Sequence, residues 1–204
     1  YTDQSFIFKP MKATISAVYP KSAFGRLLAA AEALFYEEGL NSVGIERVIE
    51  RAGVAKASLY SNFGSKDELI RSYLAMRQET RQARIQAKLS QYGSPRDKVL
   101  GVFDQLGELL VDPSFRGCAF VRAGNEAKPG SNVRGVCDDA RQWMRTLFTE
   151  LTKEAGADKP EQLAQQLVIL YDGASLSAQM DGNTAAAAQA RAMAAGLLDA
   201  ATGQ

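Results

Sequence analysis

The side chains of this sequence that are best suited to binding another molecule lie in one short basic segment. Between Val54 and Lys66 there are two lysines, three serines, an asparagine and a tyrosine, and there is no acidic residue. Ammonium groups bind phosphates, while hydroxyl and amide groups bind phosphates or the edges of bases. The chemistry indicated is therefore non-covalent recognition of nucleic acid.

The outward side chains of this segment each have a suitable partner on DNA. The amide of Asn62 fits an adenine edge, Lys56 can reach guanine or a phosphate, and Ala57 can contact a thymine methyl group. Tyr60 offers its hydroxyl to a phosphate. Lys66 lies in the first turn of the next helix, where free backbone N–H groups favour an anion. We expect DNA contacts from Lys56, Ala57, Ser58, Tyr60, Ser61, Asn62 and Lys66.

The sequence offers few residues for catalysis or for metal binding. The sequence has no histidine, which removes a His-based triad, His metal ligands and the usual general base near neutral pH. The two cysteines, Cys118 and Cys137, form neither a disulfide framework nor a zinc set. We therefore expect no enzyme activity, no metal and no cofactor. A thiol sensor remains an alternative, because Arg116 and Arg122 lie close in sequence to Cys118.

Charge and hydropathy agree with a soluble DNA-binding protein. Residues 1–92 carry 13 basic and 9 acidic residues (+4), whereas residues 93–204 carry 11 and 14 (−3), so the positive half holds the basic segment. No apolar run approaches the roughly 18 residues that would cross a bilayer. The first residues also lack the pattern of a secretory signal. A cytoplasmic location with no membrane partner is expected.

The elements that must position the basic segment are helices. Apolar residues recur at helical spacing almost throughout, so the predicted fold class is all-α. Gly53 should form a turn between two short helices, and Leu59 and Phe63 should point inward from the second. Ser65 should cap the helix that follows, which is expected to extend to about Gln91. The predicted helices cover residues 22–38, 45–52, 55–63, 65–91, 95–111, 133–155, 160–181 and 184–201, with an irregular segment over 116–132.

From Gly25 to Leu74 the sequence resembles the DNA-binding domain of the TetR family of bacterial transcriptional regulators. The similarity runs through GRLLAAAEALFYEEG and IERVIERAGVAKASLYSNFGSKDELI, in which AGV, SLY-x-x-F and SKDEL are the most specific motifs. The segments RGCAF and LAQQLVILYDGASLSAQMDG resemble one branch of the same family. The family often has a threonine before the second helix, whereas this sequence has Val43-Gly44, so we expect Ser42 to provide the cap.

The resemblance implies a domain organisation and a function. Residues 1–20 would be an irregular extension, residues 21–70 a helix-turn-helix DNA-binding domain, and residues 71–204 an effector-binding and dimerisation domain. The implied protein is a homodimeric repressor that binds a palindromic operator in double-stranded DNA and is released by a small hydrophobic effector. Two alternatives stay open: a constitutive regulator without an effector, and a redox regulator that acts through Cys118 and Cys137.

Two sets of residues in the C-terminal part are candidates for these roles. Small and aliphatic residues of the last two predicted helices could pair with a second subunit, or could simply close the core of one subunit: Leu163, Leu167, Leu170, Ala174, Ala178, Ala188, Ala192, Ala195 and Leu198. Aromatic, sulfur-containing and acidic residues could line an effector cavity, or be ordinary core: Phe103, Leu106, Phe115, Cys118, Phe120, Glu126, Trp143, Met144, Phe148, Tyr171 and Met180.

Overall fold

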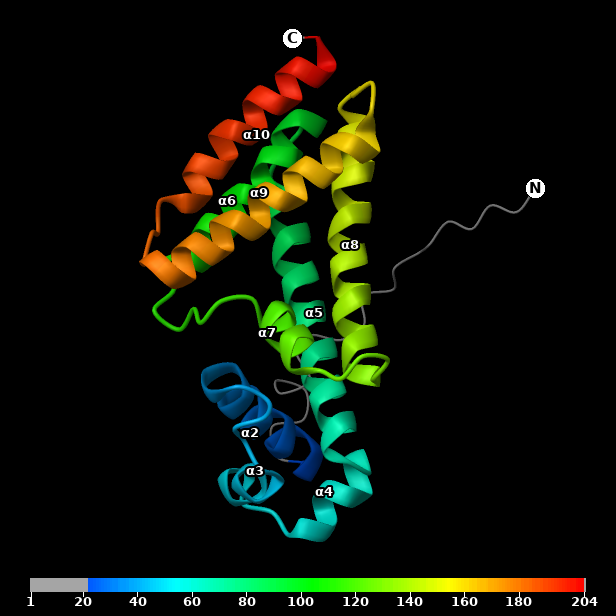
Figure 1. Ribbon diagram of the computed structural model, residues 1–204, viewed down its shortest axis with the longest axis vertical. Helices are drawn as coiled ribbons and strands as arrows, with labels where there is room; N and C mark the ends of the chain where they lie inside the picture. The colour runs from blue at the N-terminus through cyan, green and yellow to red at the C-terminus, as the bar shows by residue number, and fades with distance from the viewer. Residues whose placement is uncertain (1–21, 204) are drawn as a thin grey trace, which may run out of the picture.

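The computed structural model describes residues 22–203, and within this range the chain forms nine α-helices and no strand (Figure 1). The extension predicted over residues 1–20 lies outside the described residues. The helices are α2 (Ala23–Glu38), α3 (Ile45–Ala52), α4 (Lys56–Phe63), α5 (Lys66–Leu89), α6 (Pro95–Leu110), α7 (Ala119–Glu126), α8 (Asn132–Glu154), α9 (Pro160–Asp181) and α10 (Ala186–Thr202).

Local signals in the sequence set most helix boundaries. The hydroxyl groups of Ser22, Ser65, Ser94 and Ser131 each accept a hydrogen bond from a backbone N–H in the first turn of the following helix, as N-cap residues do. Gly53 ends α3 in the left-handed region, at φ 61°, where a side chain would be strained. The all-α prediction and the predicted order of helices are confirmed.

One element differs from the prediction. The segment over residues 116–132, expected to be irregular, contains the eight-residue helix α7. This helix has no side-chain cap, and its sequence includes Gly124, which favours helix poorly. Its formation therefore depends on tertiary contacts, because Ala119, Phe120 and Ala123 are buried against other helices.

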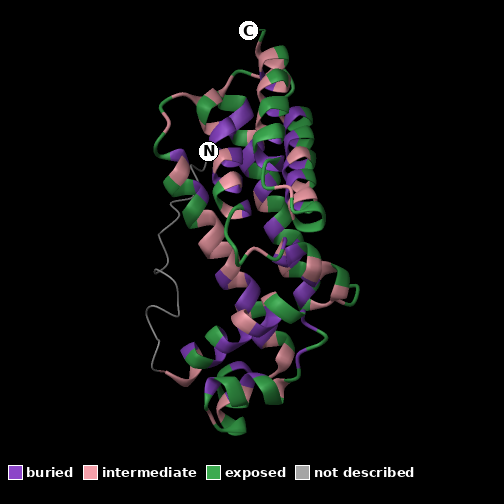
Figure 2. Ribbon diagram, turned by 90° about the vertical axis from the view of Figure 1, so that its left-hand side faces the viewer, coloured by how far each residue is buried: buried purple, intermediate pink, exposed green. Residues whose placement is uncertain are grey.

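The helices are arranged as a small head and a larger body (Figure 1). The head consists of α2, α3 and α4, and the body of α6 to α10, while α5 runs from one into the other. The short helix α7 lies where the head meets the body. The buried residues of α5 form two groups, Leu69 to Met76 beside the head and Ile85 to Leu89 in the body, and the turns between them are only partly buried or exposed (Figure 2).

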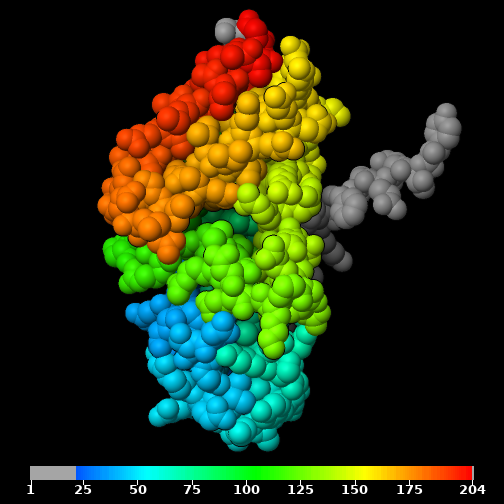
Figure 3. Space-filling view, in the orientation of Figure 1, coloured from blue at the N-terminus to red at the C-terminus, as the bar shows by residue number. Residues whose placement is uncertain are grey.

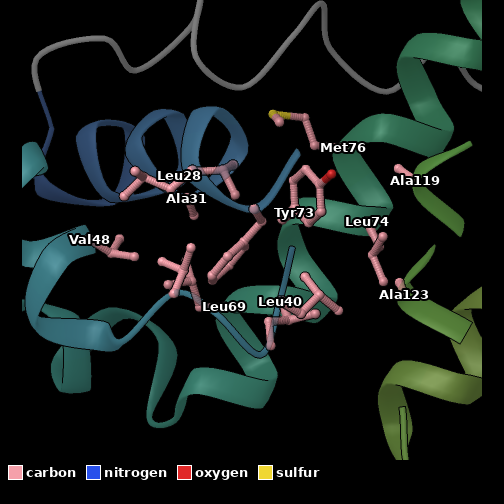
Figure 4. Packing of buried hydrophobic residues seen from close by; sticks show 14 of the residues in the cluster. Leu28, Ala31, Leu40, Val48, Leu69, Tyr73, Leu74, Met76, Ala119 and Ala123 are labelled. Atoms are coloured by element: carbon pink, nitrogen blue, oxygen red, sulfur yellow. The ribbon is translucent and has the colours of Figure 1, made fainter. Parts of the chain in front are cut away.

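The core of the head extends into the neighbouring helices of the body. Leu28, Val48 and Leu69 pack together between α2, α3 and α5, and the same buried cluster includes Ala119 and Ala123 of α7 (Figure 4). Cys137 and Ala140 at the start of α8 also belong to it. The head is therefore packed against α7 and α8, in addition to being connected to the body through α5.

The core of the body is centred on aromatic contacts between α6, α8 and α9. The ring of Phe103 lies 5.8 Å from that of Phe148 and 6.3 Å from that of Tyr171, measured between centroids.

No helix within residues 22–203 is both long and apolar enough to cross a bilayer.

Of the nine residues expected to form an interface, Ala188 and Ala192 of α10 are exposed, but the other seven are turned toward the body. Leu163, Leu167, Ala174 and Leu198 are buried in the body, and Leu170, Ala178 and Ala195 pack against it, so for these seven the alternative of an internal core is correct. The large apolar residues that are exposed on α9 and α10 are Ile169, Leu176, Met180 and Met193. Helical spacing shows that an apolar face exists, but packing decides which face turns inward.

Candidate functional site

Two buried residues fix the rotation of α4 about its axis. Leu59 is fully buried, and Phe63 stacks on Phe24 of α2 with 4.8 Å between ring centroids. Because these inward positions are four residues apart, the opposite face of the helix must point to solvent. The residues of α4 that are exposed as a result are Lys56, Ala57, Tyr60, Ser61 and Asn62.

Some of these polar groups are already hydrogen-bonded in the free protein. Lys56 Nζ lies 3.2 Å from the Oε1 of Glu46 in α3, with both side chains largely exposed. Asn62 Nδ2 donates to the carbonyl oxygen of Ser58 at 2.6 Å, and the hydroxyl of Ser61 donates to the same oxygen at 3.2 Å. Ser58 is half-buried. Tyr60, which is 45% exposed, has the most accessible aromatic ring on this helix.

The first turns of α3 and α4 have no side-chain cap. The N-cap of α3 is Gly44 and that of α4 is Ala55, and neither helix receives a capping hydrogen bond from a side chain. The expectation that Ser42 caps α3 is therefore wrong, because Ser42 lies two residues before the N-cap. Backbone N–H groups at both helix starts are left for water or for an anionic ligand.

Lys66 has a structural partner that the sequence did not reveal. Its Nζ donates to the carbonyl oxygen of Leu40 at 2.7 Å, and the side chain is half-buried. This bond ties the first turn of α5 to the loop between α2 and α3. A phosphate contact from Lys66 would have to share or replace that bond.

Two adjoining cavities lie where the head meets the body. The α2–α5 cavity, of about 320 Å³, is lined by residues of the head such as Glu32 and Tyr36, together with residues of α5 and α6. The α8–α9 cavity, of about 230 Å³, is lined mainly by α7, α8 and α9. Both are lined by Arg81, Cys118, Phe120, Tyr171 and Ser175.

The segment from Arg116 to Glu126, which we call the α7 clamp, holds the end of α2 with four hydrogen bonds. Arg122 Nη1 donates to the carbonyl oxygen of Tyr36 at 2.6 Å, and the backbone N–H of Asn41 donates to Glu126 Oε2 at 2.7 Å. The Tyr36 hydroxyl donates to the carbonyl oxygen of Gly117 at 3.1 Å and accepts from the Arg116 N–H at 2.9 Å. These partners are at least 80 residues apart in sequence, so no local signal could have revealed the contact.

The chain was compared with known proteins. The family model described as "Bacterial regulatory proteins, tetR family" matches residues 27–73. A solved TetR-family transcriptional regulator from Streptomyces coelicolor superposes with a TM-score of 0.84 at 31% identity, covering 88% of this chain and 96% of that one. The chain belongs to the TetR family.

The curated relatives of this TetR-family chain include transcriptional repressors. It is 27% identical over 168 residues to the HTH-type transcriptional repressor NemR of Escherichia coli strain K12, covering 76% of this chain and 82% of that protein. It is 30% identical over 141 residues to the HTH-type transcriptional repressor KstR2 of Mycolicibacterium smegmatis, covering 68% and 67%. The protein is accordingly a transcriptional regulator with a helix-turn-helix head, and it is not an enzyme.

Of the residues expected to bind an effector in this TetR-family protein, Phe115, Cys118, Phe120, Met144 and Tyr171 line the cavities. The other six lie outside them. Phe103, Leu106 and Phe148 are fully packed in the body core, and Trp143 packs against that core. Met180 is 75% exposed on α9, and Glu126 is engaged by the Asn41 N–H.

The two cysteines of this regulator lie beside the same cavity. Cys118 is the N-cap of α7, Cys137 is buried in α8, and both line the α8–α9 cavity. Burial, with a smaller contribution from Cys118, raises the pKa of the Cys137 thiol to about 11. Since the thiolate is the reactive form, Cys137 is poorly suited to react first in a redox sensor.

Proposed function

We propose that this TetR-family regulator binds a palindromic DNA operator as a homodimer and releases it when a small effector enters the cavities. The observation that carries the proposal is the lining of the α2–α5 cavity. Glu32 and Tyr36 of the head, Arg77 and Arg81 of α5, and Phe120 of α7 all contribute to it. A ligand there would touch the head and the body together, so its binding energy could depend on their relative position.

The exposed face of α4 supports the DNA-binding part of the proposal. A helix of this kind enters the major groove, with its outward side chains against the bases. The Lys56–Glu46 pair is solvent-exposed, and pairs of this kind contribute little stability. Lys56 can therefore exchange Glu46 for a phosphate or a guanine edge at small cost.

Exposed apolar residues on α9 and α10 support the homodimer. Ile169, Met180 and Met193 are 67%, 75% and 61% exposed, although most large apolar residues of the body are buried. Gly173 lies within α9 and Gly196 within α10, and a Cβ atom at either position would meet no atom within 4 Å. Large apolar groups beside bare backbone suit close packing of helices from a second copy. The two helices lie side by side across one face of the body (Figure 3).

The α7 clamp supports coupling between effector and DNA. Phe120 lines both cavities, while Arg122 and Glu126 on the same helix hold the end of α2. A ligand that displaces α7 would therefore move the head or release it. Two heads must be about one helical turn of DNA apart, near 34 Å, to reach successive grooves. A coupling free energy of about 1–3 kcal/mol would change operator affinity roughly 5- to 150-fold.

The proposal is tested first by selecting bound sequences from a random pool of double-stranded DNA with the purified protein. A palindrome with half-sites one helical turn apart is expected. Enrichment of no sequence would contradict the proposed function, and enrichment of an isolated half-site would contradict the dimer.

Variants of the exposed face then test the residues. Lys56→Ala and Tyr60→Ala should each weaken operator binding by about 1–3 kcal/mol, and Lys56→Ala should also reduce the salt slope by about 1. Lys128→Ala is the matched control, because Lys128 is an exposed lysine outside the head, in the loop between α7 and α8. Lys66→Ala should also weaken binding, but its circular dichroism must be checked because the bond to Leu40 is lost. Wild-type affinity in both the Lys56 and Tyr60 variants would remove this face as the DNA contact.

A further inference from the structure

Arg81 of α5 lies between the two cavities and has no acidic partner within residues 22–203. Its Nη2 donates to the carbonyl oxygen of Ala140 at 2.7 Å and to the amide oxygen of Gln78. Its guanidinium carbon lies 4.6 Å from the centroid of the Phe120 ring and 5.6 Å from that of the Trp143 ring. Its Nε is buried and has no hydrogen-bond partner within residues 22–203.

This environment is unfavourable for a cation. Burial lowers the pKa of Arg81, while Tyr171, Cys118 and Asp172 act in the opposite direction. An arginine does not lose its proton in a protein, so the side chain keeps its charge in a site that is partly shielded from water. Aromatic faces and two neutral oxygens compensate only in part, because a buried charge normally requires an ion of opposite sign.

The other charged residues around the cavities do have partners. In the α8–α9 cavity Arg134 pairs with Asp138 at 3.1 Å, and Arg141 pairs with Asp172 at 2.6 Å. In the α2–α5 cavity Arg77 lies 3.5 Å from the carboxylate of Glu32. The remaining two, Arg84 and Asp112, are solvent-exposed. Among the cavity-lining residues that the structure describes, Arg81 is thus the half-buried cation that lacks a carboxylate.

We propose that the effector is a small organic carboxylate whose charge binds Arg81 and whose apolar part packs against aromatic residues of the cavities. Phe120 and Tyr171 line both cavities, and Phe115 and Leu109 continue the apolar wall in the α2–α5 cavity. The inference rests on the proposed function and defines the chemical class of its ligand. It also follows that Glu126 does not select a cationic effector, because that carboxylate is held by the Asn41 N–H in the α7 clamp.

The test compares carboxylates with their neutral amides. Benzoate, 2-naphthoate, octanoate and decanoate are titrated into the full chain by calorimetry, alongside the four corresponding amides. At least one carboxylate is expected to bind, about 10- to 100-fold more tightly than its amide, since hydrogen bonds to a charged group are the stronger ones. Binding of no carboxylate, or equal binding of acid and amide, would overturn the inference.

Two variants test whether Arg81 causes the preference for a carboxylate over its amide. Arg81→Gln should abolish the difference between acid and amide, whereas Arg145→Gln, at an exposed position of α8 that lines neither cavity, should keep it. A preference that survives Arg81→Gln would show that another group binds the carboxylate.

The melting temperature of the ligand-free protein separates a ligand-binding role from a structural one. If Arg81 is kept for a ligand, Arg81→Met should melt within about 3 °C of the wild type or above it, because an apolar side chain suits the site better. A fall of more than about 6 °C would assign Arg81 to the stability of the fold and overturn the inference.

Operator release distinguishes the two proposals. If a neutral compound releases the selected operator while no carboxylate binds, the inference fails and the proposed function stands. If the protein binds no operator at all, the proposed function fails, whereas a carboxylate preference that depends on Arg81 would still establish the anion site.

Discussion

Replacing Arg122 by methionine should weaken the attachment of the head to the body. The guanidinium of Arg122 donates to the carbonyl oxygen of Tyr36 at 2.6 Å. Tyr36 lies in the last turn of α2, a turn that contains no basic residue of its own. Arg122 therefore supplies, from α7, the positive charge that the carboxyl end of a helix favours. Methionine keeps an apolar chain of similar length but removes the charge and the donor.

The expected loss follows from the kind of bond and its burial. A hydrogen bond to a charged group contributes about 1.5–3 kcal/mol, and the half-buried position of Arg122 places it in the lower part of that range. A loss of about 1.5–2 kcal/mol should lower the melting temperature by roughly 3–8 °C for a chain of this length. The α7 clamp would keep its contacts through Tyr36, Asn41 and Glu126, so the head should remain folded.

The assay is urea denaturation at a fixed protein concentration, because the apparent stability of the proposed dimer would depend on concentration. Arg145→Met is the matched control, since Arg145 is exposed on α8 and makes no hydrogen bond or ion pair in the described part of the chain. It should stay within about 0.5 kcal/mol of the wild type. If Arg122→Met also stays within that limit, the α7 clamp does not stabilise the head and the reasoning is refuted.

Three further predictions concern the body. Ile169→Glu should shift the protein from dimer to monomer in analytical ultracentrifugation, because it places a charge on the exposed apolar face of α9; an unchanged dimer would exclude that face. Gly101→Ala should lower the free energy of unfolding by about 1–3 kcal/mol, since its Cβ would lie 2.5 Å from the Tyr92 ring. Gly107→Ala is its control and should gain about 0.5–1 kcal/mol, because its Cβ meets only a methyl group at 3.6 Å; similar effects at both glycines would contradict the packing argument. Burial raises the pKa of the Cys137 thiol from 9.0 to about 11, so the folded state favours the protonated thiol. The contribution of this thiol to the free energy of unfolding is therefore complete below pH 9 and is lost as the pH rises toward 11. The free energy of unfolding, taken from denaturation curves between pH 9 and pH 11, should change less with pH in Cys137→Ala than in the wild type. An unchanged pH dependence would show that this thiol does not cause the loss of stability.

The sequence alone determined the head. Ser22 and Ser65 cap their helices, Gly53 has the positive φ that ends α3, and Leu59 with Phe63 orients α4. Each of these features depends on residues only a few positions apart, so periodicity and capping rules suffice to predict them. The family motifs lie in the same short segment, and the family assignment was therefore accessible as well. Whether the exposed residues of α4 contact DNA stays a prediction.

The tertiary structure alone decided how the body is used. Aromatic residues at helical spacing were equally suited to a core or a cavity, and packing placed Phe103 and Phe148 in the core but Phe120 beside the cavities. The same limit explains why residues of α9 that pack inside one subunit were expected at an interface. The sequence around Arg81 is rich in charged and polar residues and does not single it out, because its burial comes from α7 and α8, which lie far away in the sequence. Burial and pairing of a charge depend on which distant elements meet, and a one-dimensional pattern does not contain that information.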